Sequence, residues 1–339
     1  MTDHLTNLFS SAVGMLPSSP ARSYEIFSEI TSMDETACDA WVGRIRCGDT
    51  DRVTLFRAWY SRANFGQLAG HAEISMNSVN ARVPIGGQFG DITYPINSPL
   101  AITMGFAVHE AAVGNYADAM EALEDVPSIG AEHLVSWVKA VIYGAAGRWT
   151  DVIDEVKGAG AWPDKFLAAA AGVAHGVAAA SLGLFTEAER RLTESNSSPA
   201  GEACAPAIAW YLAMTRRGQG NEESAVGLLE WLSATHPEPK VTAALKDPNY
   251  RLVTTTAESI AARKDPVGRG ERRGGQLGPR EAARRGRGRT RPSDRAHPRQ
   301  GADRGVSRGN ADGQDPRGAR HEGSAGVQAH DLCGPAGYR

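Results

Sequence analysis

The sequence has few cysteines and lacks the short cysteine and histidine spacings that metal sites require. Its four cysteines, Cys38, Cys47, Cys204 and Cys333, lie far apart along the chain. Structural zinc sites usually pair their ligands about two to four residues apart, and small disulfide scaffolds are much richer in cysteine. We therefore expect isolated, reduced thiols, as in a cytosolic protein. No metal centre or disulfide framework is predicted.

Motifs for export and catalysis are also missing. Residues 1–16 have no basic stretch followed by an apolar run, so no signal peptide is predicted. Residues 166–184 are nearly uncharged, but they are mostly Ala and Gly, which favours a buried helix over a membrane span. His109-Glu110 begins like a zinc-protease motif, yet Val113 stands where the second histidine is needed. With no nucleophile elbow or complete Walker motif either, no catalytic or cofactor site is predicted.

Large apolar residues are absent from most of the C-terminal part. Residues 267–339 contain 16 Arg and 16 Gly but no Lys, Ile, Met, Phe or Trp. Ordering a backbone costs roughly 1–2 kcal/mol per residue, which this composition cannot offset. The sequence thus predicts a folded domain over residues 1–266 and a disordered tail over residues 267–339. The folded part has 20 basic and 31 acidic residues, a net charge of −11 that disfavours nucleic-acid binding.

The sequence does contain a repeated pattern in its middle. Each copy has an Ala-rich run, a glycine, and a second run with a small residue followed four positions later by Leu or Val. The glycines are Gly114, Gly147, Gly183 and Gly220, at intervals of 33, 36 and 37 residues. The pattern predicts helical hairpins in which glycine closes the first helix in a left-handed turn. It is similar to the tetratricopeptide repeat.

Two weaker hairpins, over residues 5–30 and 34–59, raise the expected number to about six. Residues 79–85 and 91–96 are β-prone runs flanking the glycine-rich segment 86–90, which predicts a β-hairpin at about 79–96. No Gly-Lys-Ser/Thr follows those glycines, which favours a turn over a phosphate loop. The predicted fold class is all-α: a tetratricopeptide-like right-handed solenoid of about six units with an inserted β-hairpin and a disordered C-terminal tail.

The concave face of such a solenoid is lined by the first helix of each unit. The positions expected to be exposed there are apolar: Met104, Val108, Trp137, Val141, Val173, Val177, Trp210 and Met214. A groove with Trp and Met anchors fits an amphipathic helix of a partner protein. The alternative is that the protein's own β-hairpin or terminal helix covers these residues.

Three segments, 39–49, 90–95 and 114–123, together resemble the EccA family, the cytosolic AAA+ ATPases of type VII secretion systems. The resemblance covers residues 1 to 266. It implies an N-terminal tetratricopeptide-like domain with a β-finger, which engages secretion substrates or regulates a C-terminal ATPase module. In the family that module binds ATP and Mg and assembles into rings. This chain, which lacks it, is expected to bind neither, and to work in the cytoplasm with secreted substrates or secretion components, without nucleic acid or membrane insertion.

The resemblance stops at Asp265-Pro266, where the family continues into its nucleotide-binding module. We interpret residues 267–339 as a translation in a shifted frame. Permitted codons for residues 329–339, read one nucleotide later, give His-Met-Ile-Phe-Val-Gly-Pro-Pro-Gly-Thr-Gly, the opening of a Walker A loop. The competing hypothesis is a helical scaffold with a genuine cationic tail that binds nucleic acid nonspecifically. Such tails usually interleave aromatic residues, and this one has only Tyr338.

Overall fold

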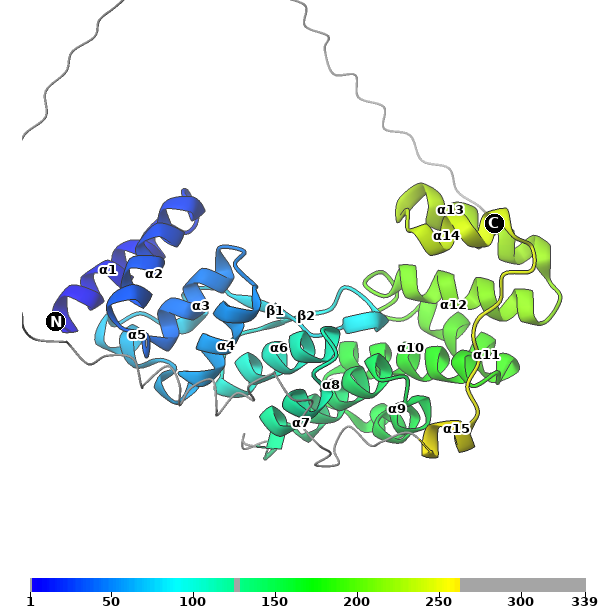
Figure 1. Ribbon diagram of the computed structural model, residues 1–339. Coiled ribbons are helices and arrows are strands. Elements are labelled where there is room, and N and C mark those ends of the chain that lie inside the picture. Colours follow the sequence, from blue (N-terminus) through cyan, green and yellow to red (C-terminus); the bar gives the residue numbers. More distant parts are fainter. Residues whose placement is uncertain (1, 125–128, 263–339) are drawn as a thin grey trace, which may run out of the picture. The chain divides into compact units, whose positions relative to one another are not determined.

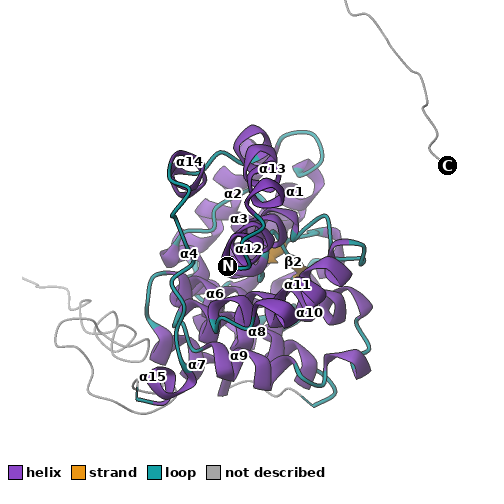
Figure 2. Cartoon of the chain, turned by 90° about the vertical axis from the view of Figure 1, so that its right-hand side faces the viewer, coloured by secondary structure: helices purple, strands orange, loops and turns teal. Residues whose placement is uncertain are grey.

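The computed structural model describes residues 2–124 and 129–262, and the tail predicted over residues 267–339 lies outside them. These residues form fifteen α-helices and two short β-strands, arranged mainly as antiparallel helical pairs (Figures 1 and 2). The six pairs are α1 (Thr2–Met15) with α2 (Pro20–Met33), α3 (Cys38–Arg46) with α4 (Arg52–Tyr60), α6 (Pro99–Ala112) with α7 (Tyr116–Glu124), α8 (Glu132–Ala145) with α9 (Trp149–Val156), α10 (Lys165–Ser181) with α11 (Phe185–Asn196), and α12 (Ala205–Gly218) with α13 (Glu222–Thr235). The predicted all-α solenoid of about six units is confirmed.

The turns within the pairs follow the predicted glycine pattern. Gly114, Gly147, Gly183 and Gly220 have φ angles of 84°, 67°, 76° and 85°, a left-handed conformation that is strained for other residues. The N–H after each glycine donates to a carbonyl five residues back, as from Asn115 to Glu110 over 2.8 Å. These bonds satisfy carbonyls left free at the helix ends.

The small residues of the pattern let the paired helices approach closely. Ala119, Val152, Ala188 and Ala225 are fully buried on the second helices. Gly176 of α10 adds to this, because a Cβ there would lie 2.7 Å from Leu192 Cγ on α11. Close approach lets the Ala-rich helix α10 form part of the core, as the sequence predicts for residues 166–184.

A β-hairpin interrupts the solenoid between α4 and α6. It follows the short helix α5 (Gln67–His71) and consists of β1 (Arg82–Pro84) and β2 (Thr93–Pro95). The strands are antiparallel, with Val83 opposite Tyr94, and a 3-10 turn at Gly87–Phe89 lies at the tip. The predicted hairpin is confirmed, although its strands are shorter than the β-prone runs. Main-chain bonds from the Ile85 N–H to the Ile92 carbonyl (2.7 Å) and from the Ile96 N–H to the Ala81 carbonyl (2.9 Å) continue the pairing just beyond the two strands.

Two elements follow the last pair. Helix α14 (Pro239–Lys246) packs on α13, and α15 (Ala257–Ala261) packs on α9, six helices earlier in the chain. Between them the chain runs without helix or strand and crosses α12 and α11 (Figure 1). Residues 247–262, including α15, are called the strap below.

No helix among the described residues is both long and apolar enough to cross a membrane.

Candidate functional site: the β-hairpin and the hollow beside it

The eight residues predicted to line an open groove are all buried. They lie in pairs on α6, α8, α10 and α12, as expected, but none is more than 6% exposed. The prediction of an open groove at these residues is therefore wrong for this structure. The alternative interpretation, that the chain's own segments cover the face, describes what is observed.

The tip of the β-hairpin covers α8. Trp137 Nε1 donates to the carbonyl of Ile85 over 2.9 Å, and Gln88 Nε2 donates to the carbonyl of Val141 over 3.3 Å. The Phe89 and Trp137 ring centroids lie 5.9 Å apart in a tilted arrangement. Trp137, predicted to anchor a partner, is thus an anchor for the protein's own hairpin, with its indole N–H satisfied inside the core.

The hairpin also contacts the helical pairs on either side of α8. Val83 packs onto Gly105 of α6, where a Cβ would lie only 2.6 Å from Val83 Cγ1. At the other end, the Asp91 N–H donates to the carbonyl of Ala203 over 2.8 Å, just before α12. Burial of Cys204 beside this contact raises the pKa of its thiol to about 11, so the thiol stays protonated and unreactive.

Different segments cover the last predicted anchor, Trp210. Lys240 of α14 places its Nζ 5.0 Å from the centroid of the Trp210 ring, and Tyr250 of the strap contacts the same ring edge-on at 6.0 Å. This end of the concave face is therefore covered by the chain that follows the last helical pair, and not by the hairpin.

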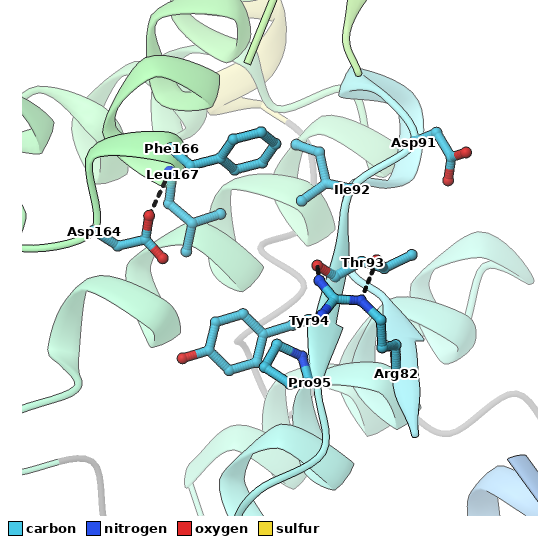
Figure 3. A pocket seen from close by; sticks show the side chains of 9 residues that line it. All are labelled: Arg82, Asp91, Ile92, Thr93, Tyr94, Pro95, Asp164, Phe166 and Leu167. Atoms are coloured by element: carbon cyan, nitrogen blue, oxygen red, sulfur yellow. Dashed lines mark hydrogen bonds between the residues drawn. The ribbon is translucent and has the colours of Figure 1, made fainter. Parts of the chain in front are cut away.

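An opening remains beside the hairpin, between β2 and the start of α10 (Figure 3). It is a hollow of about 430 Å³ lined by Arg82, Asp91, Ile92, Thr93, Tyr94, Pro95, Asp164, Phe166 and Leu167. Figure 3 shows Phe166 and Leu167 pointing toward Ile92, with the Tyr94 ring on the same side as Asp164. Phe166 is 37% exposed. The hollow has an apolar floor and a polar rim.

The rim of the hollow has a helix cap at Asp164 and a neutral phenol at Tyr94. Asp164 caps α10 by accepting the Leu167 N–H over 3.0 Å. Burial raises the pKa of Tyr94, and the negative charge of Asp164 adds to the shift. Both effects keep the phenol neutral. The rim thus offers a carboxylate and a hydroxyl to a visiting group.

The edge of β2 is poorly suited to adding a strand. Arg82 donates to the Thr93 side-chain and main-chain oxygens over 2.8 and 2.9 Å, which occupies acceptors that a new strand would need. Pro95 of β2 has no N–H to offer. We therefore expect a partner to place side chains in the hollow, and not to extend the two-stranded sheet.

The sequence motifs set aside as non-catalytic have structural roles. Glu110, which follows His109, is fully buried and receives a bidentate bond from Arg52 at 2.8 and 3.1 Å, and a bond from Asn115 at 2.7 Å. It links α4 to the turn after α6. Within residues 2–124 and 129–262, no cluster of three or more potential metal ligands is found.

Sequence reasoning missed the hollow. Its members come from two distant stretches, 82–95 and 164–167, and no spacing relates them. The sequence contains one signal for an exposed apolar site. Phe166 lies two residues after the capping residue Asp164, in the first turn of the helix, where capping does not require an aromatic side chain.

The fold and the site define a helical-repeat domain whose concave face is covered by its own β-hairpin and by the chain that follows its last helical pair. Known proteins have a similar sequence and fold. Residues 1–270 match the family described as T7SS, ESX-1 secretion system protein EccA1, N-terminal domain. A crystal structure of the N-terminal domain of EccA1 ATPase from the ESX-1 secretion system of Mycobacterium tuberculosis is similar, with a TM-score of 0.77 and 76% identity over 79% of this chain and 97% of that one.

Whole-length relatives give the same result. The chain is 76% identical over 266 residues to ESX-1 secretion system protein EccA1 of M. tuberculosis H37Rv, and 77% identical over 267 residues to EccA1 of Mycolicibacterium smegmatis MKD8. ESX-5 secretion system protein EccA5 of Mycobacterium marinum is 31% identical over 258 residues. These matches cover 75–78% of this chain. The chain belongs to the EccA1 N-terminal domain family of type VII secretion, as the sequence resemblance indicated.

The chain spans less than half the length of these relatives, 46% for both EccA1 proteins and 42% for EccA5. The matched part is the N-terminal domain of a protein described as an ATPase, and the match provides no ATPase module for this chain.

Proposed function

We propose that residues 1–266 form a protein-binding domain that works in the cytoplasm, where it engages secreted substrates or other components of a type VII secretion system. We further propose that the hollow between β2 and α10 receives an apolar side chain of the bound protein. Membership of the EccA1 N-terminal domain family supports the role in secretion. The exposed Phe166 ring at the mouth of the hollow carries the assignment of the site.

The chemistry of the hollow supports a side chain as its occupant. Ile92, Leu167 and the rings of Tyr94 and Phe166 supply apolar surface, and binding energy in protein interfaces concentrates in such pockets. Asp164 and the Tyr94 hydroxyl can accept or donate hydrogen bonds at the rim. A partner therefore needs an exposed segment that carries one large apolar side chain next to a hydrogen-bonding group.

Site-specific photo-crosslinking of the full chain in its host cell tests this proposal. A benzoylphenylalanine at position 166 should form adducts identified by mass spectrometry as type VII substrates or components. The same group at position 231, an exposed tryptophan on α13, is the matched control and should not form them. Once a partner is identified, Phe166→Ala should weaken its affinity about tenfold. Equal adducts at the two positions, or none from the secretion system at 166, would contradict the proposal.

A further inference from the structure

The strap turns the chain back along the solenoid after its last helix. It leaves α14, crosses α12 and α11, and ends as α15 against α9 (Figures 1 and 2). The chain therefore leaves the described domain beside the fourth helical pair, although its last pair is the sixth.

Burial along the extended part of the strap largely alternates, as expected of a segment lying in a shallow groove. Tyr250, Leu252 and Thr255 are half-buried, whereas Arg251, Val253 and Thr254 are exposed. Leu252 packs against the cluster formed by Ala179, Ala180 and Ala188, small residues of α10 and α11, and Tyr211 of α12 packs against the same cluster. The Thr255 N–H donates to the Ser181 carbonyl over 2.9 Å, which joins the strap to the end of α10.

A buried arginine fixes the beginning of the strap. Arg217 pairs with Glu222, and its Nη1 donates to the carbonyls of Ala244, Asp247 and Tyr250 at 3.0, 3.4 and 3.4 Å. This geometry sets the direction in which the chain leaves α14. These bonds hold residues 247–250, the start of the strap, against Arg217.

The far end of the strap is attached weakly. Helix α15 has five residues, too few to be stable without the surface beneath it. Its main buried side chain is Ile260, against α9. A segment held by a few side chains and an isolated main-chain bond opens more readily than the core on which it lies.

We propose that the strap is a releasable latch, in which Leu252 seated on the apolar strip formed by Ala179, Ala180, Ala188 and Tyr211 controls whether residues 251–262 are docked or free. Release uncovers this strip and detaches α15 from α9. Because the strap leads directly into the chain beyond residue 262, force or binding there acts on the latch before it reaches the helical pairs.

Hydrogen exchange on the full chain, comparing two neighbouring substitutions, tests the latch. Leu252→Asp places a charge on the apolar strip, and we expect exchange at the Thr255 amide to rise at least tenfold. Val253→Asp adds the same charge at a side chain that is 87% exposed, and exchange should not change. Thr255→Pro, which removes the N–H donor, should also release residues 251–262 if Leu252→Asp disturbs the helices. Equal exchange in the two aspartate variants would overturn the proposal.

Binding of a separate peptide with the sequence of the strap tests whether the apolar strip recognises Leu252. A labelled synthetic peptide with the sequence of residues 247–262 should bind saturably to the full Leu252→Asp chain, whose own strap is released. A peptide carrying Val253→Asp should bind equally well, and one carrying Leu252→Asp at least tenfold more weakly. Failure of the unmodified peptide to bind, or binding that does not depend on Leu252, would show that the strap is not a latch.

Discussion

At the scale of single residues, the large side chains predicted to meet a partner instead stabilise the domain. Trp137 is fully buried and donates its indole N–H to the hairpin. Glu110, in a motif that first suggested a metal site, is a buried carboxylate joined to Arg52 and Asn115. The contacts from Trp137 to Ile85 and from Arg52 to Glu110 span 52 and 58 residues, so each stabilises the tertiary structure more than its own helix.

We predict that Trp137→Ala lowers the free energy of unfolding by about 3–5 kcal/mol, because it removes a large buried ring and leaves the Ile85 carbonyl without its donor. Urea denaturation measures this. Trp231→Ala, which truncates a tryptophan that is largely in solvent, is the control and should cost less than about 1 kcal/mol. Similar losses in the two variants would contradict the assignment of Trp137 to the core.

His175 should make stability sensitive to mildly acidic pH. Burial, followed by the positive charge of Arg191, lowers its pKa below the ordinary value of 6.5. The unfolded chain therefore binds a proton before the folded chain does, and stability falls as pH drops below about 6.5. The nearby Glu187, with a pKa of about 2 because Arg190 and Arg191 bind it, stays charged in this range.

We therefore expect the wild-type chain to lose more stability between pH 7.5 and 5.5 than the His175→Gln variant. Urea midpoints at the two pH values measure the difference, because the other histidines contribute equally to both proteins. An identical pH dependence would show that His175 is as accessible to protons in the folded chain as in the unfolded one.

At the scale of elements, the space around helical glycines shows where the hairpin contacts a helix and where the helix surface is open. A Cβ on Gly144 of α8 would lie 2.8 Å from the buried Phe89 ring and closer still to Gln88. We predict that Gly144→Ala destabilises the domain by about 1–3 kcal/mol by pushing the hairpin away. Gly227→Ala on α13, where nothing lies within 4 Å, should stabilise it by about 0.5–1 kcal/mol. Thermal melting of both variants checks these opposite signs.

The helical pairs could be predicted from sequence because their signals are local. The left-handed glycine and the small residue of the second helix lie only five positions apart, as in Gly114 with Ala119 and Gly147 with Val152. The covering of the concave face could not be predicted, since Trp137 meets Ile85 across 52 residues and no periodicity records that contact. The β-prone runs are longer than the two strands, although main-chain bonds between Ile85 and Ile92 and between Ile96 and Ala81 continue the pairing past Pro84 and Pro95.

At the scale of the whole molecule, the family match ends close to where the composition changes. The family matches residues 1–270, and the Arg/Gly-rich sequence begins at about residue 267. We predict that sequencing the gene across codon 267 will show a shift of reading frame relative to its relatives. An intact frame, with no ATPase-coding sequence downstream, would sink this hypothesis and leave the cationic tail as a genuine part of the protein.

Nucleotide should not stabilise this chain, because its sequence contains no complete Walker motif. Adding millimolar ATP and Mg²⁺ is expected to leave the melting temperature unchanged, since only a ligand that binds the folded state raises it. A nucleotide-binding ATPase measured under the same conditions is the positive control. A concentration-dependent rise in the melting temperature of this chain would reveal a binding site elsewhere in it.

The β-hairpin also determines how this solenoid can fold. Repeat proteins usually behave as one-dimensional chains, in which each unit contacts only its neighbours and folding can begin at any unit. Here one insertion touches α6, α8 and the segment before α12, through Gly105, Trp137 and Ala203. Those units cannot close around it until the hairpin is in place, which raises the contact order and slows folding. We therefore expect the middle of the domain to unfold as one cooperative block, without fraying of individual repeats.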